Sequence, residues 1–109
     1  MDVKTAQHVV MTQADLAQTD SFLARLQQHH PPIPGQVTSL LLALKVITED
    51  LKAAIQLDRA LAYALHQLAY ESRRAYERGK QARVEWPPLL DDDIERIAIA
   101  IAQIFKGGA

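Results

Sequence analysis

Two long helical patterns joined by a very short connection occupy residues 36–79, and they constrain the fold more than any other stretch of the chain. In the first pattern, apolar residues from Val37 to Ile55 recur at steps of three and four, the spacing of one face of an α-helix. Further apolar residues widen this face, which indicates that the helix has neighbours on two sides. We therefore expect a central helix over about residues 36–56.

The second pattern covers about residues 58–79. Asp58 is a suitable N-cap because its carboxylate can accept a free backbone N–H of the first turn. Gly79 is a suitable C-terminal stop because glycine adopts the left-handed conformation without a Cβ clash. Since the connection near Gln56 and Leu57 leaves room only for a tight turn, the sequence predicts an antiparallel helical hairpin.

The remaining chain predicts further helices around this hairpin. Residues 2–17 show a modest amphipathic pattern, residues 21–28 follow a cluster of capping residues, and residues 92–106 carry an apolar stripe. Asp92 and Glu95 have the spacing of a capping box at the start of the last helix. We expect one all-α domain over residues 1–109, a four- to five-helix bundle.

Two proline segments separate the predicted helices, Pro31-Pro32-Ile33-Pro34 and Trp86-Pro87-Pro88. Proline stops a helix and stiffens the chain, so both segments are expected to form rigid corners. Such segments also dock in grooves of other proteins, which is the alternative interpretation.

The composition argues against several classes of function. A net charge of −1 is not that of a dedicated nucleic-acid binder, and the absence of cysteine excludes disulfides, thiolate catalysis and zinc–cysteine sites. The sequence shows no signal-peptide pattern and no run near the ~20 apolar residues of a membrane span, so we expect a cytoplasmic protein. The four histidines lack metal-site spacing, and no catalytic constellation is visible. We therefore expect no enzyme, no catalytic residue, no cofactor and no metal.

The outward side of the second helix mixes aromatic and basic residues, the composition that interface cores favour. This stripe consists of Arg59, Tyr63, His66, Tyr70, Arg73 and Glu77. Trp86 and Ile99, the latter on a final helix with little polar surface, complete the expected interaction surface. The leading hypothesis is a non-enzymatic interaction protein, either a homo-oligomer or a small adaptor. The alternative is that the tyrosines only cover neighbouring helices of the same chain.

Two other functions remain open. A small molecule or anion would occupy a pocket near Trp86, His66 and the arginines of the second long helix. Regulatory nucleic-acid binding would use the basic residues Arg73, Arg74, Arg78 and Arg83, although the net charge opposes it. Basic residues near a helix C-terminus are explained more simply because they complement the helix dipole.

Three stretches together resemble a family of small uncharacterised cyanobacterial proteins, with the similarity starting at about Thr19. They are PPIPGQVTS followed by LLALKV within residues 31–46, LDR and LAYALH within residues 57–66, and VEWPPLL at residues 84–90. The resemblance implies an all-helical cytosolic protein and no particular activity. Some members carry the label dethiobiotin synthetase, an activity that needs the phosphate-binding motif G-x-x-x-x-G-K-[ST]. Here Gln81 follows Gly79-Lys80 and Arg74 occupies the place of the first glycine, so the sequence argues against that activity.

Overall fold

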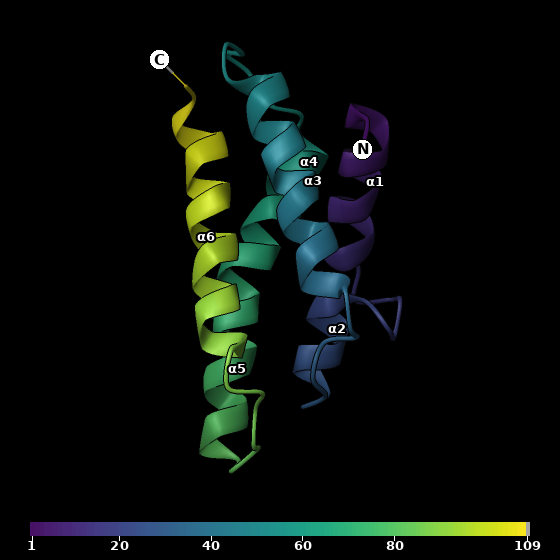
Figure 1. The fold of residues 1–109 in the computed structure, drawn as a ribbon, viewed down its shortest axis with the longest axis vertical. Coiled ribbons are helices and arrows are strands. Elements are labelled where there is room, and N and C mark those ends of the chain that lie inside the picture. Colours follow the sequence, from purple (N-terminus) through teal and green to yellow (C-terminus); the bar gives the residue numbers. More distant parts are fainter. Residues whose placement is uncertain (109) are drawn as a thin grey trace.

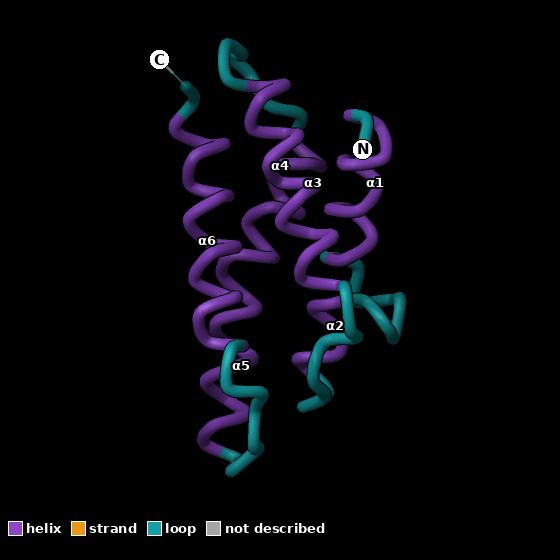
Figure 2. The backbone as a smooth tube through the Cα atoms, viewed as in Figure 1, coloured by secondary structure: helices purple, strands orange, loops and turns teal. Residues whose placement is uncertain are grey.

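The computed structural model describes residues 1–108, which contain helices and connecting segments but no strand. Figures 1 and 2 show an elongated bundle, with extents of 43 × 24 × 22 Å. The helices are α1 (Val3–Gln13), α2 (Phe22–Gln27), α3 (Gln36–Leu51), α4 (Arg59–His66), the π-helical turn η1 (Gln67–Glu71), α5 (Ser72–Gln81) and α6 (Leu90–Lys106). α4, η1 and α5 follow one another without a break and are called the long helix below. The predicted all-α bundle is confirmed.

Consecutive helices in this bundle are not always neighbours. In the view of Figure 1, α1 and α2 run downward, α3 upward, the long helix downward and α6 upward. α3 packs mainly against α1 and α6, whereas the long helix packs against α1, α2 and α6. The two arms of the predicted hairpin are therefore antiparallel, as expected, but they face each other across the diagonal of the bundle.

This diagonal explains why the first arm is shorter than predicted. α3 ends at Leu51 rather than near residue 56, and residues 52–58 form a connection without helical structure. The prediction that Ile55 lies on the inner face is wrong, because its side chain is 98% exposed. A tight turn can join adjacent antiparallel helices, but a chain that crosses the end of a bundle needs an extended connection. The helix must end early to provide it.

The second arm begins as predicted and ends later. The Leu61 N–H donates to Asp58 Oδ2 at 3.0 Å, which confirms the N-cap. The predicted stop at Gly79 is wrong, since the helix continues to Gln81. Arg83 adopts a left-handed φ of 64°, and the Val84 N–H donates to the Gly79 carbonyl at 2.8 Å, which together close the helix as a Schellman motif.

At the N-terminal end, α1 is also shorter than the predicted range of 2–17. Asp2 caps it by accepting the Thr5 N–H at 2.7 Å, and this hydrogen bond lowers the pKa of the Asp2 carboxyl. After Gln13 the chain turns, because the Asp15 carboxylate accepts the Ala17 N–H at 2.9 Å and stabilises a bend in place of another helical turn. We call residues 14–20 the elbow. The short helix predicted after the elbow is present, and the Ser21 hydroxyl caps it.

The final helix starts at Leu90, two residues before the predicted start. Leu89 is its N-cap and makes no capping side-chain bond, so the predicted capping box of Asp92 and Glu95 is wrong. Asp91, Asp92 and Asp93 still occupy the first turn, where negative charge complements the helix dipole. α6 ends at Gly107 as predicted.

One apolar core runs along the bundle and draws on every α-helix. Its largest fully buried side chains are Phe22, Leu23, Leu26, Leu40, Leu44, Ile47, Leu65, Leu68, Leu90, Ile94, Ile97 and Ile101. Each such side chain stabilises the fold by about 1.5–3 kcal/mol relative to an exposed position. Over residues 1–108, no helix has both the length and the apolar character needed to cross a membrane.

Candidate interaction surface

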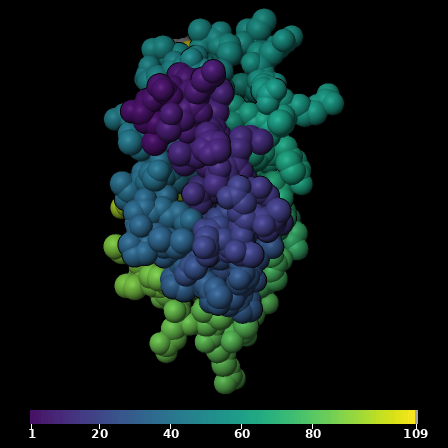
Figure 3. Space-filling view, turned by 90° about the vertical axis from the view of Figure 1, so that its right-hand side faces the viewer, coloured from purple at the N-terminus to yellow at the C-terminus, as the bar shows by residue number. Residues whose placement is uncertain are grey.

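An open groove of about 590 Å³ lies between α1 and α4 and ends on the elbow. Its exposed apolar side chains are Met11, Leu16 and Tyr63, which are 40%, 45% and 64% accessible to solvent. The polar side chains along the groove are His8, Thr12, Asp15, Gln18 and Gln67. Figure 3 looks onto this flank, with α1 in purple between α3 in blue and the long helix in green. Gathered apolar side chains with polar neighbours are typical of surfaces that bind another protein. We call these residues the groove face.

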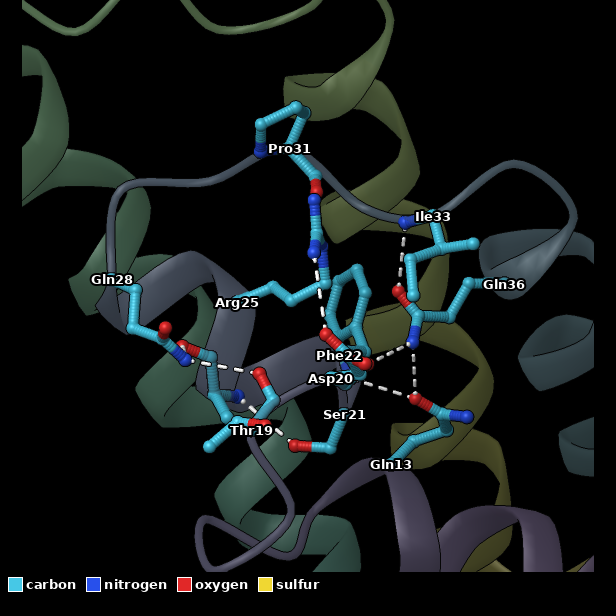
Figure 4. A network of polar contacts seen from close by, with 11 residues as sticks. Gln13, Thr19, Asp20, Ser21, Phe22, Arg25, Gln28, Pro31, Ile33 and Gln36 are labelled. Atoms are coloured by element: carbon cyan, nitrogen blue, oxygen red, sulfur yellow. Dashed lines mark hydrogen bonds and ion pairs between the residues drawn. The ribbon is translucent and has the colours of Figure 1, made fainter.

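The elbow that closes the groove is held in place by a partly buried amide network, shown in Figure 4. Gln13 Oε1 accepts hydrogen bonds from the Phe22 N–H at 2.7 Å and from Gln36 Nε2 at 2.9 Å. Gln36 Nε2 also donates to the Asp20 carbonyl at 2.8 Å, while its Oε1 accepts the Ile33 N–H at 3.1 Å. One side chain at the start of α3 therefore fixes the elbow and the first proline segment. The sequence reasoning missed this role of Gln36, because a lone glutamine beside Gly35 gives no pattern.

Two residues of the predicted stripe, His66 and Tyr70, stack on each other on the outer face of the long helix. The rings of His66 and Tyr70 stack with centroids 5.4 Å apart, and the Arg74 guanidinium lies 5.4 Å from the Tyr70 centroid. The sequence pattern assigned Arg73 rather than Arg74 to this stripe. A π turn adds one residue to the helix, so each later side chain is rotated by roughly 100° relative to an uninterrupted α-helix. Arg74 follows Tyr70 by four residues, the spacing of helical neighbours, whereas Arg73 points toward α6.

A buried polar residue directly after the π turn helps to explain it. The Ser72 hydroxyl is fully buried and donates a hydrogen bond to the Leu68 carbonyl one turn earlier. A serine that bonds backward in this way competes with the backbone N–H for the same carbonyl and distorts the helix. A serine on the apolar face was the only local signal for the change of register.

Arg73 instead joins the long helix to α6. Its Nη1 lies 2.6 Å from Asp91 Oδ1 and 3.8 Å from Glu77 Oε1, and its Nη2 lies 3.4 Å from Glu95 Oε2. The guanidinium also lies over the Tyr76 ring, 5.3 Å from its centroid. Because three carboxylates and a ring surround it, Arg73 belongs to the contact between two helices and leaves the expected stripe. Glu77 pairs with Arg73 and leaves the expected stripe with it.

Trp86 is likewise engaged within the chain. Its ring stacks on Tyr76 with centroids 6.0 Å apart, and its Nε1 donates to the Tyr76 carbonyl at 3.0 Å. A Cβ atom on Gly79 would lie 2.6 Å from Nε1 of Trp86, so the glycine makes room for the indole. His66 precedes Tyr76 by ten residues on the long helix, so it lies roughly 15 Å from Tyr76 along the helix axis. The structure therefore does not bring Trp86 and His66 together into the expected pocket.

The two remaining predicted residues lie on open surface. Arg59 is exposed at the start of α4, next to the groove lining. Ile99 is 54% exposed, on the side of α6 opposite its buried stripe. A single exposed isoleucine is common on protein surfaces, whereas the groove gathers several apolar side chains. Among the predicted residues, Tyr63 lines the groove, and Arg59 directly precedes the lining residue Ala60.

Within residues 1–108, no group of three or more His, Asp or Glu side chains lies close enough to hold a metal ion. Comparison with known protein families, with curated proteins and with solved structures gave no match.

Proposed function

We propose that this chain is a non-enzymatic protein-interaction protein, acting through self-association or as a small adaptor, and that its binding surface is the groove face. The observation that carries the proposal is the gathering of Met11, Leu16 and Tyr63, each at least 40% exposed, along one groove. A partner that covers these side chains removes apolar area from water, which favours association by about 25 cal/mol per Å² before the costs of binding.

The rigidity of the groove supports the same proposal. α1 and α4 are fixed by the core, and the Gln13–Gln36 network holds the elbow. A surface that is ordered before binding loses little conformational entropy when its partner arrives. Tyr63 adds a large, amphipathic ring with few rotatable bonds, a residue type that often dominates interface energetics.

The test uses immobilised protein and an extract of the cells from which the sequence comes. Wild type is compared with the double variant Leu16→Glu/Tyr63→Asp and with the control Ile99→Asp, which alters an exposed apolar residue on α6. We expect a protein retained by wild type and by the control to be lost from the double variant. That protein must then bind purified wild-type chain directly, as measured by calorimetry.

Each contrary pattern has a definite meaning. Equal retention by wild type and by the double variant rejects the groove face as the binding surface. Loss with Ile99→Asp alone moves the interface to α6.

A further inference from the structure

We infer that the side chain of Gln36 is a conformational coupler, which makes the elbow and the first proline segment (residues 31–34) open and close as one unit. The elbow lines the groove face, whereas Pro32, Ile33 and Pro34 help to line a separate cavity of about 260 Å³. Two different surfaces of the molecule are therefore linked through one side chain. The inference goes beyond the proposed function, because it holds whatever binds the groove face.

The amide of Gln36 has one orientation that satisfies its neighbours, as Figure 4 shows. Its Nε2 donates to Gln13 Oε1 at 2.9 Å and to the Asp20 carbonyl at 2.8 Å, while its Oε1 accepts the Ile33 N–H at 3.1 Å. A flipped amide would set its oxygen against two acceptors and its nitrogen against a donor. Because Gln36 is only 9% exposed, a partly engaged amide would leave buried polar atoms unpaired. These hydrogen bonds therefore form and break together.

The first proline segment depends on Gln36 because proline has no backbone N–H. Ile33 carries the only backbone donor within residues 31–34, and this donor bonds to Gln36 Oε1. The other end of the segment is held by Arg25, whose Nε donates to the Pro31 carbonyl at 2.7 Å. The Gln36 backbone N–H donates to the Ile33 carbonyl at 3.0 Å, and this bond survives when the side chain is replaced. The contribution of the Gln36 side chain can therefore be measured separately.

The elbow is tied to the same amide. Gln13 Oε1 accepts the Phe22 N–H at 2.7 Å as well as the bond from Gln36, so it joins the two residues that flank the elbow and its turn into α2. Between the elbow and the proline segment, α2 is anchored in the core by the fully buried side chains of Phe22, Leu23 and Leu26. The elbow and the proline segment thus lie on either side of a fixed helix, and the Gln13–Gln36 bond connects them.

The central test is hydrogen exchange of single amides in the native protein, followed by NMR. Gln13→Ala removes the acceptor of the Phe22 N–H, and coupling requires faster exchange also at Ile33, which bonds to Gln36 instead. We expect an increase of about threefold or more at Ile33, since a lost neutral hydrogen bond changes local opening by about twofold to tenfold. The buried Ile97 of α6 reports global unfolding, and dividing by its change removes any general loss of stability.

A matched pair of substitutions separates the hydrogen bonds from the packing. Gln13→Glu keeps an acceptor oxygen for both bonds, so Phe22 and Ile33 should exchange within about twofold of wild type. Gln36→Glu has nearly the same shape but removes both donors, so the two amides should exchange about tenfold faster. Gln103→Ala, at an exposed glutamine of α6, should change neither amide.

Coupling must also run in the opposite direction, because it is reciprocal. Ile33→Pro removes the donor to Gln36 Oε1, while position 33, which precedes Pro34, already favours the extended backbone that proline adopts. The Phe22 N–H at the far side of the elbow should then exchange about threefold faster or more.

Faster exchange at Phe22 with unchanged exchange at Ile33 in Gln13→Ala would overturn the inference, because the two segments would then open independently. Wild-type exchange in Gln36→Glu would overturn the role of the amide, and an unchanged Phe22 in Ile33→Pro would remove the reciprocity. All of these measurements use the free protein, so their outcome is independent of whether the capture experiment supports the groove face.

Discussion

On the side of the long helix that faces α6, Arg73, Tyr76 and Trp86 engage one another and the carboxylates of α6. On the side that faces α1, Arg59 and Tyr63 are the same kinds of residue, yet they remain exposed beside an open groove. The difference teaches that aromatic and basic composition alone does not identify an interaction surface. Within residues 1–108, the side that faces α1 leaves such residues without partners, and the proposed binding surface lies there.

On the side of the long helix that faces α6, filling the space that the Trp86 indole occupies should have the largest effect on stability. Gly79→Val places a side chain where Trp86 packs, and we expect a loss of about 2–3 kcal/mol in the free energy of unfolding from overpacking. Urea denaturation measures the loss, and the emission of the single tryptophan should shift to the red as Trp86 becomes solvated. Ala82→Val, at the exposed end of the same helix, is the control. Unchanged emission in Gly79→Val would mean that the indole does not depend on this glycine.

Breaking the link between the long helix and α6 should have a smaller effect. Arg73→Met keeps most of the apolar stem but removes the ion pairs to Asp91 and Glu95 and the cation–π contact with Tyr76. We expect a loss of about 1 kcal/mol, since the pairs are partly solvated, and less of it in high salt. Arg74→Met is the matched control and should cost under about 0.5 kcal/mol. Equal costs for the two variants would contradict the different surroundings of the two arginines.

Two helix ends allow a gain in stability without any new contact. His29 and Arg83 adopt left-handed φ angles of 63° and 64°, where a Cβ atom is unfavourable, and both occupy the glycine position of a Schellman motif. We expect His29→Gly and Arg83→Gly each to raise the free energy of unfolding by about 0.5–1 kcal/mol. Arg78→Gly, inside α5, should lower it by about 1 kcal/mol. Thermal denaturation of the three variants checks the signs, and a loss in both Schellman variants would contradict this account.

Substitutions on the side of the long helix that faces α1 should change the stability of the fold least. Leu16→Ser and Tyr63→Ser remove exposed apolar groups, so each should change the free energy of unfolding by no more than about 0.5 kcal/mol. The same variants should weaken binding at the groove face. A loss well above 1 kcal/mol in dilute protein would show that these side chains support the isolated chain, which would erase the contrast between the two sides.

Local features of the chain were predictable because their causes are local. The N-cap at Asp58, the capping cluster at the start of α2 and the apolar stripe of α6 rest on residues within one or two helical turns, and the structure contains all of them. The candidate site was predicted only in part. Tyr63 lines the groove, but the groove also needs Met11 and Leu16 from the N-terminal segment, and nothing in the sequence relates that segment to α4.

The sequence by itself determined that the chain forms amphipathic helices, and it placed most of their starting points, because helical periodicity and capping depend on neighbouring residues. Only the tertiary structure decided that α3 and the long helix lie diagonally opposite, that Arg73 pairs with α6 while Arg74 lies beside Tyr70, and that Trp86 covers Gly79. These outcomes depend on which apolar faces share the core and on what space remains around them. That is a property of the whole packing, which no local pattern encodes.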